Sequence, residues 1–324
     1  MSEAKLLYLG QSDVSQVGLT MREIIDALET AFKEKGNGKV EMPPKPGIHP
    51  QPDAFIHAMP AYIPALKSAG LKWVSGFPQN VDRGLPYITG LLVLNDPETG
   101  LPLSVMDCVW ITAMRTGAAT ALAAKYLARS GSATVGILGC GVQGRTNLLA
   151  LKELFPLTSV RAYDIHPERI EAYATEMHEK TGLDVQPVTQ PREAVVGCDI
   201  VVTAGPILKQ PHATIQAGWL EPDAFASPVD FDSYWHPDAL AQADKFCTDD
   251  TPQLRYYQEV GYFQHIPPVH ADLGELAAGN RPGRERDDER IICCNLGLAI
   301  DDMATAILIY QRAVERGIGT WLPL

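Results

Sequence analysis

A glycine-rich turn is the clearest chemical motif in this sequence. It reads Gly139-Cys140-Gly141-Val142-Gln143-Gly144 and lies between a β-branched apolar run at 134–138 and a helix-like segment at 145–154. This G-x-G-x-x-G spacing is typical of dinucleotide-binding folds. The first glycine permits a tight turn, the second lets the backbone approach a pyrophosphate, and the third allows close helix packing. Because N–H groups at a helix start bind phosphates, we expect a dinucleotide to contact Gly139, Gly141, Val142 and Gln143.

An aspartate after the next strand indicates which dinucleotide is bound. Asp164 directly follows a predicted strand at 159–163. It lies about 20 to 25 residues after the first glycine, the spacing at which an acid accepts hydrogen bonds from the adenosine ribose. A carboxylate there would repel a 2′-phosphate, so we expect NAD(H) rather than NADP(H). Thr203, at the end of a predicted buried strand at 199–203, is a further expected cofactor contact.

Three positively charged residues lie in apolar, strand-like or loop segments, where a buried charge would need an anionic partner. Lys72 lies in the strand-like GLKWV, Arg115 in TAMRTGA at a predicted helix start, and Lys45 in a proline-rich loop. Together they would suit a substrate carboxylate, which arginine can bind through two nitrogens. The alternatives are that Lys45 and Lys72 are solvated surface lysines, and that Arg115, with Thr116, binds a cofactor phosphate.

Acids and a histidine complete the candidate set. Asp230 follows a predicted parallel strand, at the sheet edge where α/β proteins bind ligands, and could be a general acid or base. It could instead cap a turn, as could Asp232. His57 lies among apolar residues and could titrate or bind an anion near neutral pH, or simply be hydrogen-bonded in the core. The acids interpreted as helix-surface or capping residues are Glu275, Asp301 and Asp302.

The first third of the chain predicts a helix followed by a mainly antiparallel sheet. Residues 20–35 are amphipathic and begin with a capping box, Thr20 followed by Glu23. The predicted strands lie at 5–9, 54–61, 71–74, 90–94 and 102–106, and the last two form a hairpin around 95–100.

The rest of the chain alternates between strands and helices. An alanine-rich helix at 113–129 is expected to contain the domain boundary, and a long amphipathic helix at 299–316 is expected to return to the first domain. Segment 262–269 fits neither pattern. The further predicted strands lie at 185–187, 224–228, 245–248 and 291–295, and the further helices at 167–180, 191–196 and 272–278.

Composition restricts the class of protein. The 324 residues are 46% hydrophobic and 20% charged, with a formal net charge of −12. Without a dense lysine or arginine cluster, we expect neither nucleic acid nor a membrane surface as partner. We see no secretory signal and no apolar run near the roughly 20 residues that span a bilayer. Six scattered cysteines without C-x-x-C spacing predict reduced thiols, no metal site and a cytoplasmic location.

Several motifs together resemble one known family. They are MPP at 42–44, MPA at 59–61, GLKWV at 70–74, TAMRTGAATALAAKYLA at 112–128, GILGCGVQG at 136–144, ADLGELAAGNRPGR at 271–284 and NLGLAIDDMATA at 295–306. In order and spacing the chain resembles the ornithine cyclodeaminase/mu-crystallin family. The resemblance implies an α/β fold: a Rossmann NAD-binding domain, 119–298, inserted into an α+β substrate-binding and dimerisation domain, 1–118 with 299–324. It also implies a homodimer.

The resemblance also implies roles for individual residues. Lys72 and Arg115 would grip the substrate carboxylate, Lys72 within the catalytic centre, and Lys45 stands where many members have arginine. Asp230 stands at the position of the family's catalytic aspartate, and Asp232 is the alternative. His57 stands where ornithine-specific members have a glutamate that holds the distal amine. A histidine offers that amine no fixed negative charge, which speaks against ornithine as the substrate.

Three functions follow as hypotheses. The first is an NAD(H)-dependent oxidoreductase that interconverts a small α-amino acid and its imino acid, such as iminosuccinate and aspartate, or pyruvate with ammonia and alanine. The second is ornithine cyclodeamination to proline and ammonia. The third is small-molecule binding without catalysis, as in mu-crystallin-like members. Lys72, Arg115 and Asp230 favour chemistry, because a binding protein needs no catalytic carboxylate.

Overall fold

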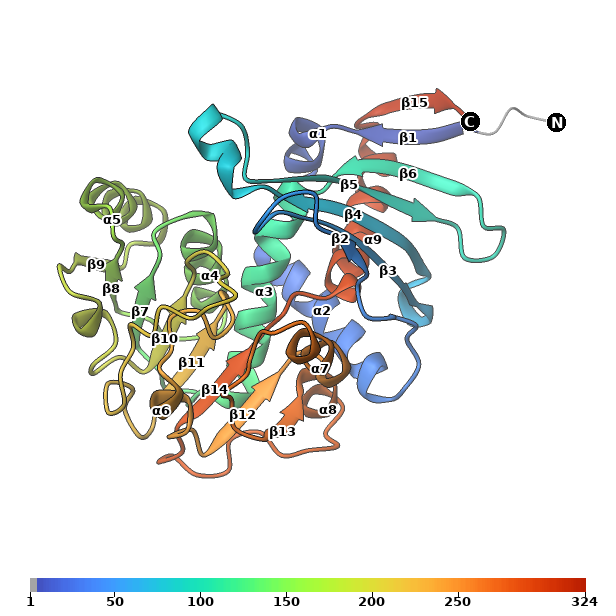
Figure 1. The fold of residues 1–324 in the computed structure, drawn as a ribbon. Helices are drawn as coiled ribbons and strands as arrows, with labels where there is room; N and C mark the ends of the chain where they lie inside the picture. The colour runs from blue at the N-terminus through green and yellow to red at the C-terminus, as the bar shows by residue number, and fades with distance from the viewer. Residues whose placement is uncertain (1–4) are drawn as a thin grey trace. The chain divides into compact units, whose positions relative to one another are not determined.

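The chain, described by a computed structural model over residues 5–324, divides into two compact units (Figure 1). One comprises the chain up to Arg115 together with Leu298–Leu324, and the other comprises Thr116–Gly297. The chain passes from the first unit to the second within helix α3, Val109–Leu127. The first unit is therefore discontinuous in sequence. This agrees with the expectation that the helix at 299–316 packs on the N-terminal part of the chain.

The first unit contains a seven-stranded sheet in the order β15-β1-β6-β5-β4-β3-β2. Its strands are antiparallel to their neighbours except for the parallel pair β1 and β6. The strands are β1 Lys5–Leu9, β2 Gly47–Ile48, β3 Phe55–Ile63, β4 Ser68–Gly76, β5 Ile88–Asn95, β6 Pro102–Asp107 and β15 Thr320–Pro323. The α-helices are α1 Gln11–Gln16, α2 Met21–Gly36 and α9 Ala299–Arg316, with 3-10 turns at Pro64–Leu66 and Pro78–Arg83.

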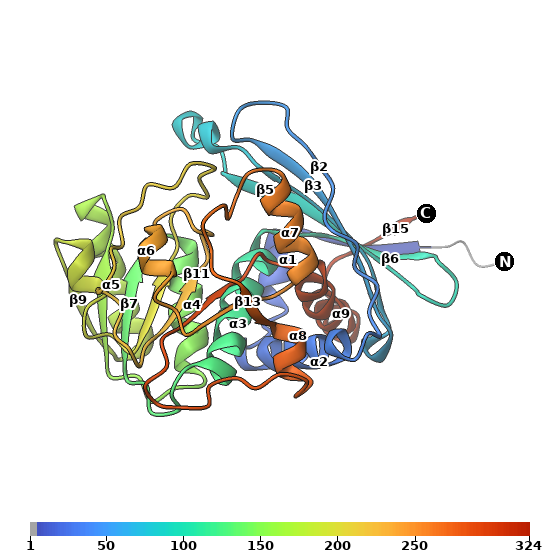
Figure 2. The same ribbon diagram turned by 60° about the horizontal axis from the view of Figure 1, so that its bottom comes forward.

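Alternation along the strands gives this sheet one buried face. Leu7, Met59, Leu92 and Met106 are almost completely buried on it. Helix α9 packs against β3, β4 and β5 and lies beside α2 (Figure 2). The start of α2 is fixed by the predicted capping box, in which Thr20 N donates to Glu23 Oε2 at 2.8 Å and Glu23 N donates to Thr20 Oγ1 at 3.3 Å.

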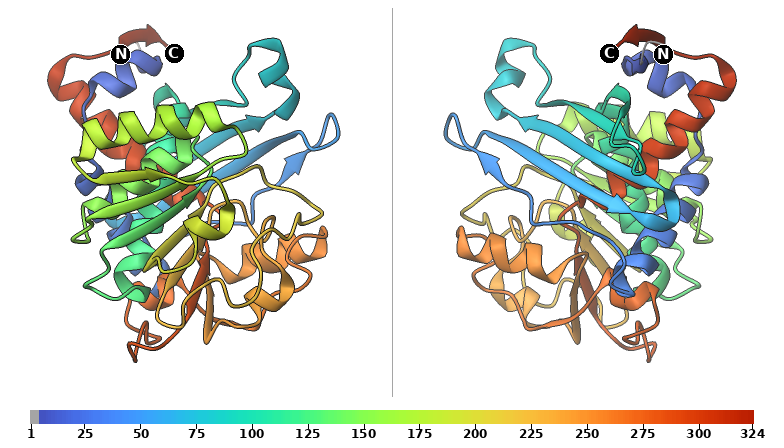
Figure 3. Two further views of the ribbon diagram at one scale, coloured as in Figure 1. Left: turned by 90° about the vertical axis from the view of Figure 1, so that its left-hand side faces the viewer. Right: turned by 90° about the vertical axis from the view of Figure 1, so that its right-hand side faces the viewer.

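The second unit contains an eight-stranded sheet in the order β13-β12-β14-β11-β10-β7-β8-β9, in which every pair is parallel. Figure 3 shows β7, β8 and β9, green to yellow-green, side by side. Because β8 and β10 flank β7 on opposite sides, the strand order reverses there, and such a switch point is where doubly wound sheets bind nucleotides.

The elements of this unit are short. The strands are β7 Thr134–Leu138, β8 Ser159–Tyr163, β9 Asp184–Pro187, β10 Ile200–Thr203, β11 Phe225–Pro228, β12 Lys245–Thr248, β13 Val269–Asp272 and β14 Ile291–Cys294. The helices are α4 Val142–Lys152, α5 Pro167–Thr181, α6 Pro237–Leu240, α7 Thr251–Glu259 and α8 Leu273–Ala277, with a 3-10 turn at Pro191–Ala194. Among residues 5–324, every helix is too short or too polar to cross a lipid bilayer.

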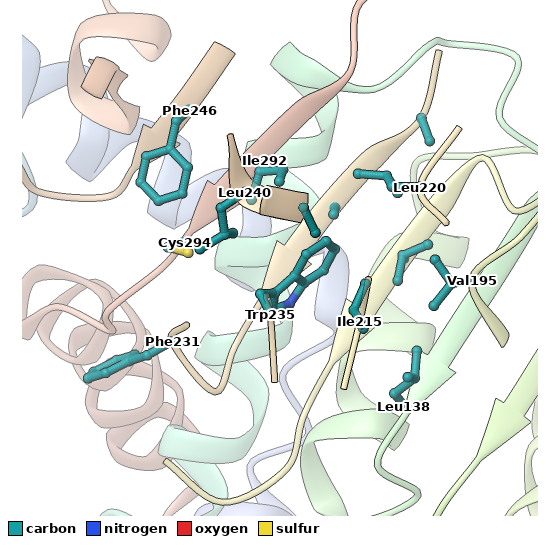
Figure 4. Packing of buried hydrophobic residues seen from close by; sticks show 14 of the residues in the cluster. Leu138, Val195, Ile215, Leu220, Phe231, Trp235, Leu240, Phe246, Ile292 and Cys294 are labelled. Atoms are coloured by element: carbon teal, nitrogen blue, oxygen red, sulfur yellow. The ribbon is translucent and has the colours of Figure 1, made fainter. Parts of the chain in front are cut away.

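Aromatic residues anchor the loop that follows β11. Trp235 and Phe231 are 1% and 4% exposed and belong to an apolar cluster that includes Leu240, Phe246 and Ile292 (Figure 4). Phe231 also packs on Tyr257 and Phe263, with ring centroids 5.0 and 4.9 Å apart. These contacts hold the loop from both sides, and the candidate acid Asp230 lies in this loop.

The structure corrects some predicted elements. Helix α3 begins at Val109 rather than 113, because Asp107 accepts a hydrogen bond from Val109 N at 2.9 Å and caps the first turn. This first turn is apolar and rich in β-branched residues, so its sequence does not indicate a helix. Arg115 therefore lies inside the helix rather than at its start. The pattern also misses α1, α6, α7, β2, β13 and β15, short elements whose stability comes from tertiary packing and pairing.

Candidate active site

The glycine turn has the geometry expected of a dinucleotide loop. Gly139 has φ +108°, and a Cβ there would lie 2.6 Å from Ala204 O, in the segment after the neighbouring strand β10. A Cβ at Gly144 would overlap Gly139 O, so α4 packs directly on the turn. Both positions require glycine for steric reasons.

The space over the second glycine is open. A Cβ at Gly141 would meet no heavy atom within 4 Å, and Gly141 is the N-cap of α4. Its backbone is therefore accessible to a pyrophosphate beside the N–H groups of the first helical turn, so these residues fit a dinucleotide. Val142 is 61% exposed in this turn, whereas the Gln143 side chain contacts Asn147 in α4.

Asp164 is attached to the same loop. Its Oδ2 accepts a hydrogen bond from Cys140 N at 2.9 Å, and its Oδ1 accepts one from His166 N at 3.0 Å. The carboxylate thus lies at the end of β8 next to the glycine turn, as the position of a ribose-binding acid requires.

Asp230 lies at the carboxyl edge of the same sheet. It follows β11, is 1% exposed, and accepts hydrogen bonds from Thr203 Oγ1 at 2.5 Å and Gly205 N at 2.8 Å. Thr203 in turn accepts one from Trp235 Nε1 at 3.2 Å, so its hydroxyl orients Asp230. Burial raises the pKa of Asp230 to about 7 even though these hydrogen bonds lower it. The carboxyl can therefore give or take a proton near neutral pH.

The backbone after Asp230 separates it from the second acid. Phe231 has φ +64°, a conformation that non-glycine residues rarely adopt. The turn directs Asp232 toward the backbone of Phe263, and burial raises its pKa. Of the two candidates, Asp230 is the acid bonded to the loop after β10, and the geometry favours it.

The first unit contains a buried cluster of cations and acids. Lys72 Nζ lies 2.7 Å from Asp302 Oδ1 and 2.7 Å from Oδ2, and 3.4 Å from Thr112 Oγ1. Arg115 Nε donates to Asp302 Oδ1 at 3.2 Å, and its Nη1 lies 3.4 Å from Asp301 Oδ2. Lys72 is 1% exposed and Arg115 is 6% exposed.

These positions correct two interpretations made from the sequence. Lys72 and Lys45 are buried, Lys45 at 9% exposure, so neither is a solvated surface lysine. Asp301 and Asp302 are 0% exposed and are not helix-surface acids, although Asp301 does cap Leu298 N at 3.0 Å. The sequence signal for this burial is the pair of adjacent acids in the otherwise apolar segment NLGLAIDDMATA. Acids in an apolar segment are expected to be buried beside positively charged or hydrogen-bonding groups. Glu275 forms a capping box with Asp272, as expected of it.

His57 lies on the same face of the sheet as Lys72. In register, Met59 pairs with Lys72 and His57 pairs with Val74, so these four side chains share a face. The imidazole stacks on Phe55, with ring centroids 4.3 Å apart. Burial, and then the charges of Lys45, His49 and Lys72, lower its pKa to about 3. Of the two alternatives given for His57, this favours a neutral, buried side chain over titration near neutral pH.

One residue near the cofactor loop was missed in the sequence. The Tyr234 ring lies over Gly205, where a Cβ would be 2.6 Å from Tyr234 Cε2. Burial, and then the charges of Asp230 and Asp164, raise the pKa of its phenol to about 12. In sequence Tyr234 carries no motif, because its place depends on the turn after β11.

The fold and the site define a two-unit α/β protein with a dinucleotide loop on one unit and a buried cluster of charges on the other. The chain belongs to the ornithine cyclodeaminase/mu-crystallin family, whose model matches residues 7–317. This confirms the resemblance that the sequence motifs carry, and with it the Rossmann-type fold of the second unit.

Relatives with named activities match nearly the whole chain. An alanine dehydrogenase of Archaeoglobus fulgidus is 35% identical over 322 residues, 97% of each chain. The structure of Thermococcus litoralis Δ1-pyrroline-2-carboxylate reductase, in complex with NADH and L-proline, is 35% identical with a TM-score of 0.87, covering 97% of this chain and 99% of that one. An archaeal alanine dehydrogenase dimer with bound NAD is 34% identical with a TM-score of 0.88, covering 98% and 99%.

The raised pKa of Asp230 predicts a pH-dependent stability. The folded protein binds this proton at pH values up to about 7, whereas an unfolded aspartate loses it near pH 4. The stabilisation from the protonated carboxyl is therefore complete below about pH 4 and is lost as the pH rises to 7, by on the order of a few kcal/mol. Asp230→Asn removes this dependence. Urea unfolding at pH 5 to 8 should show the variant gaining stability relative to wild type as the pH rises; parallel curves would contradict the assignment.

Proposed function

We propose that this protein is an NAD(H)-dependent oxidoreductase that interconverts a small α-amino acid and its imino acid by hydride transfer at Cα. The observation that carries the proposal is Asp230, a buried carboxyl with a pKa of about 7 at the edge of a dinucleotide-binding sheet. A purely structural aspartate would be expected at the surface or beside a cation. The activities named for the alanine dehydrogenase and pyrroline-2-carboxylate reductase relatives support this reaction class.

The cofactor is NAD(H) in this proposal. Gly139, Gly141, Val142 and Gln143 would hold the pyrophosphate, Asp164 the adenosine ribose, and the segment at Thr203 the region near the reacting ring. When bound, the nicotinamide supplies or accepts the hydride. The NADH and NAD complexes of the two solved relatives support the choice. Arg115 is assigned to the substrate, because its guanidinium lies with Lys72 on the acids of the first unit, and with Thr116 it stays the alternative ligand of a cofactor phosphate.

Lys72 and Arg115, with Lys45, would hold the substrate α-carboxylate. Anchoring it fixes the position of Cα, and such positioning can lower a barrier by several kcal/mol. Asp230 would exchange a proton with the nitrogen, donating it as the amine forms and accepting it in the reverse direction. A pKa of about 7 suits both directions at neutral pH.

His57 and Phe55 disfavour a cationic substrate side chain. A neutral imidazole stacked on a phenyl ring offers no anion for a distal ammonium, and Lys45, His49 and Lys72 act on His57 as positive charges. Pyruvate with ammonia, giving alanine, a cyclic imino acid and iminosuccinate all fit this environment better than ornithine. The same argument disfavours ornithine cyclodeamination, and the buried Asp230 disfavours a role in binding alone.

A substrate panel tests the proposal. Purified protein with NADH, ammonia and separate 2-oxo or cyclic imino acids should oxidise NADH with a substrate whose side chain is uncharged or acidic, followed at 340 nm. Lys72→Ala and Arg115→Ala should lower turnover by about 100-fold or more, because the carboxylate loses its anchor. Lys33→Ala and Arg22→Ala remove exposed cations of the same unit and should leave turnover unchanged. Proline formed from ornithine without net NADH change would support the cyclodeaminase instead.

The choice of NAD has its own test. Asp164→Ser removes the negative charge that would repel a 2′-phosphate while keeping an acceptor for Cys140 N. The ratio of kcat/KM with NADH to that with NADPH should fall about tenfold or more. An unchanged ratio would mean that Asp164 does not contact the ribose.

We further propose that the chain is a homodimer joined through the outer face of the seven-stranded sheet. Trp73 and Leu91 lie opposite each other on this face and are 47% and 45% exposed, and Tyr8 is 41% exposed on the same side. A row of exposed large apolar side chains is typical of an interface. The dimer described for the archaeal alanine dehydrogenase supports a second copy as the partner.

A single charge tests this interface. Trp73→Glu should convert the dimer to a monomer, because a carboxylate in an apolar interface is desolvated without a partner. Light scattering after size-exclusion chromatography measures the mass. Val314→Glu places the same charge at another exposed apolar residue, 45% exposed on α9, and should leave the dimer intact. A monomeric wild-type protein would contradict the proposal.

Two assignments complete the proposal. The first unit corresponds to the substrate-binding and dimerisation domain expected at 1–118 with 299–324, and the second to the NAD-binding domain expected at 119–298. A cytoplasmic location is supported by six cysteines that are all free and buried, as expected of reduced thiols.

A further inference from the structure

Two acids beside the substrate-binding cations have no role in the function proposed so far. Asp301 and Asp302 lie in the first turn of α9 and are completely buried. Asp302 contacts both cations, Lys72 from β4 and Arg115 from α3. One carboxylate therefore links three elements that are far apart in sequence.

The charge on Lys72 depends on this carboxylate. Burial lowers the pKa of Lys72, Asp302 raises it, and Arg115 lowers it further. Cys108 also acts on Lys72, but burial raises the pKa of that thiol to about 11, so it is uncharged at neutral pH. The Thr112 hydroxyl and His57, whose pKa burial lowers, also lie near the ammonium. Among these groups Asp302 supplies the negative charge.

Both acids lie in the first turn of α9. The positive end of the helix dipole stabilises anions in the first turn. Asp301 also accepts a hydrogen bond from Leu298 N at 3.0 Å, which fixes the start of the helix and places Asp302 one residue further on. The helix therefore presents an anion to the sheet at a set place.

Lys72 is held by two residues. Its Nζ donates to Asp302 Oδ1 at 2.7 Å and to Thr112 Oγ1 at 3.4 Å, and Asp302 Oδ2 also lies 2.7 Å away. An ammonium has three N–H groups, so a substrate carboxylate would bind through an N–H that Lys72 shares with these oxygens.

We propose that Asp302 is a positioning residue of the substrate site: its carboxylate keeps Lys72 charged and, with Asp301, orients Lys72 and Arg115 toward the substrate carboxylate. This rests on the proposed function insofar as the ligand is an amino or imino acid. The charge of Lys72 itself does not depend on that identification.

Asp302→Asn tests the electrostatic part without substrate. Lysine labelled with 13C at Cε reports the titration of Lys72 by NMR, with Lys72→Met assigning the signal. In the variant, the proton affinity of Lys72 should fall about tenfold or more, because an opposite charge in contact is removed. Asp199→Asn breaks a partly buried ion pair with Arg129 in the other unit and should leave the titration unchanged. An unchanged Lys72 titration in Asp302→Asn would overturn the proposal.

Kinetics test the positioning part. In Asp302→Asn the KM for the substrate found in the panel should rise about tenfold or more toward alkaline pH, as Lys72 loses its proton, while kcat falls less. Asp301→Asn should raise KM without this pH dependence. A loss of stability alone, with KM and its pH profile unchanged, would assign Asp302 a structural role and contradict the proposal. A silent panel together with a shifted Lys72 titration would contradict the proposed function and leave the role of Asp302 in charging Lys72 standing.

A double variant covers the case in which Asp302→Asn does not fold. If the defect is an uncompensated Lys72 charge, Lys72→Met with Asp302→Asn should fold, because both charges are then removed. Circular dichroism and thermal unfolding measure this. A double variant that stays unfolded would show that Asp302 acts through its shape rather than its charge, and would overturn the proposal.

Discussion

The first unit depends on a buried set of ion pairs between β4, α3 and α9. Placing Lys72 inside the sheet removes its ammonium from water, which is unfavourable unless an anion lies in contact. Asp302 provides that anion at 2.7 Å, so α9 has to pack with its first turn against β4. This constraint explains why the last long helix belongs to the first unit although more than half of the chain lies between them. It also places two cations beside each other without leaving their repulsion uncompensated.

Two buried aspartates in this protein have different surroundings. Asp302 contacts an ammonium and a guanidinium at a helix start. Asp230 is equally buried but contacts a hydroxyl and a backbone N–H, which compensate only part of the lost hydration, and its pKa rises to about 7. The first arrangement suits the holding of charges, and the second suits the exchange of protons. Their difference is the chemical basis of the function proposed here.

His57 follows the same principle with the opposite sign. Burial and neighbouring positive charges favour its neutral form. A residue type that commonly titrates near pH 7 is therefore an uncharged ring here, stacked on Phe55. The specificity inferred for this site thus depends on what surrounds the imidazole rather than on its intrinsic chemistry.

The sequence by itself determined the features that depend on local contacts. The glycine turn, the capping box of α2, strand β12 and helix α9 could be predicted because their steric and periodic requirements lie within a few neighbouring residues. The order of motifs also identified the family and the α/β fold class. Only the tertiary structure decided that Asp301 and Asp302 are buried against Lys72 and Arg115, that Asp230 rather than Asp232 reaches the loop after β10, and that His57 is neutral. Each of these depends on desolvation and on charges brought together from distant segments, and a pattern in one stretch of sequence carries no information about either.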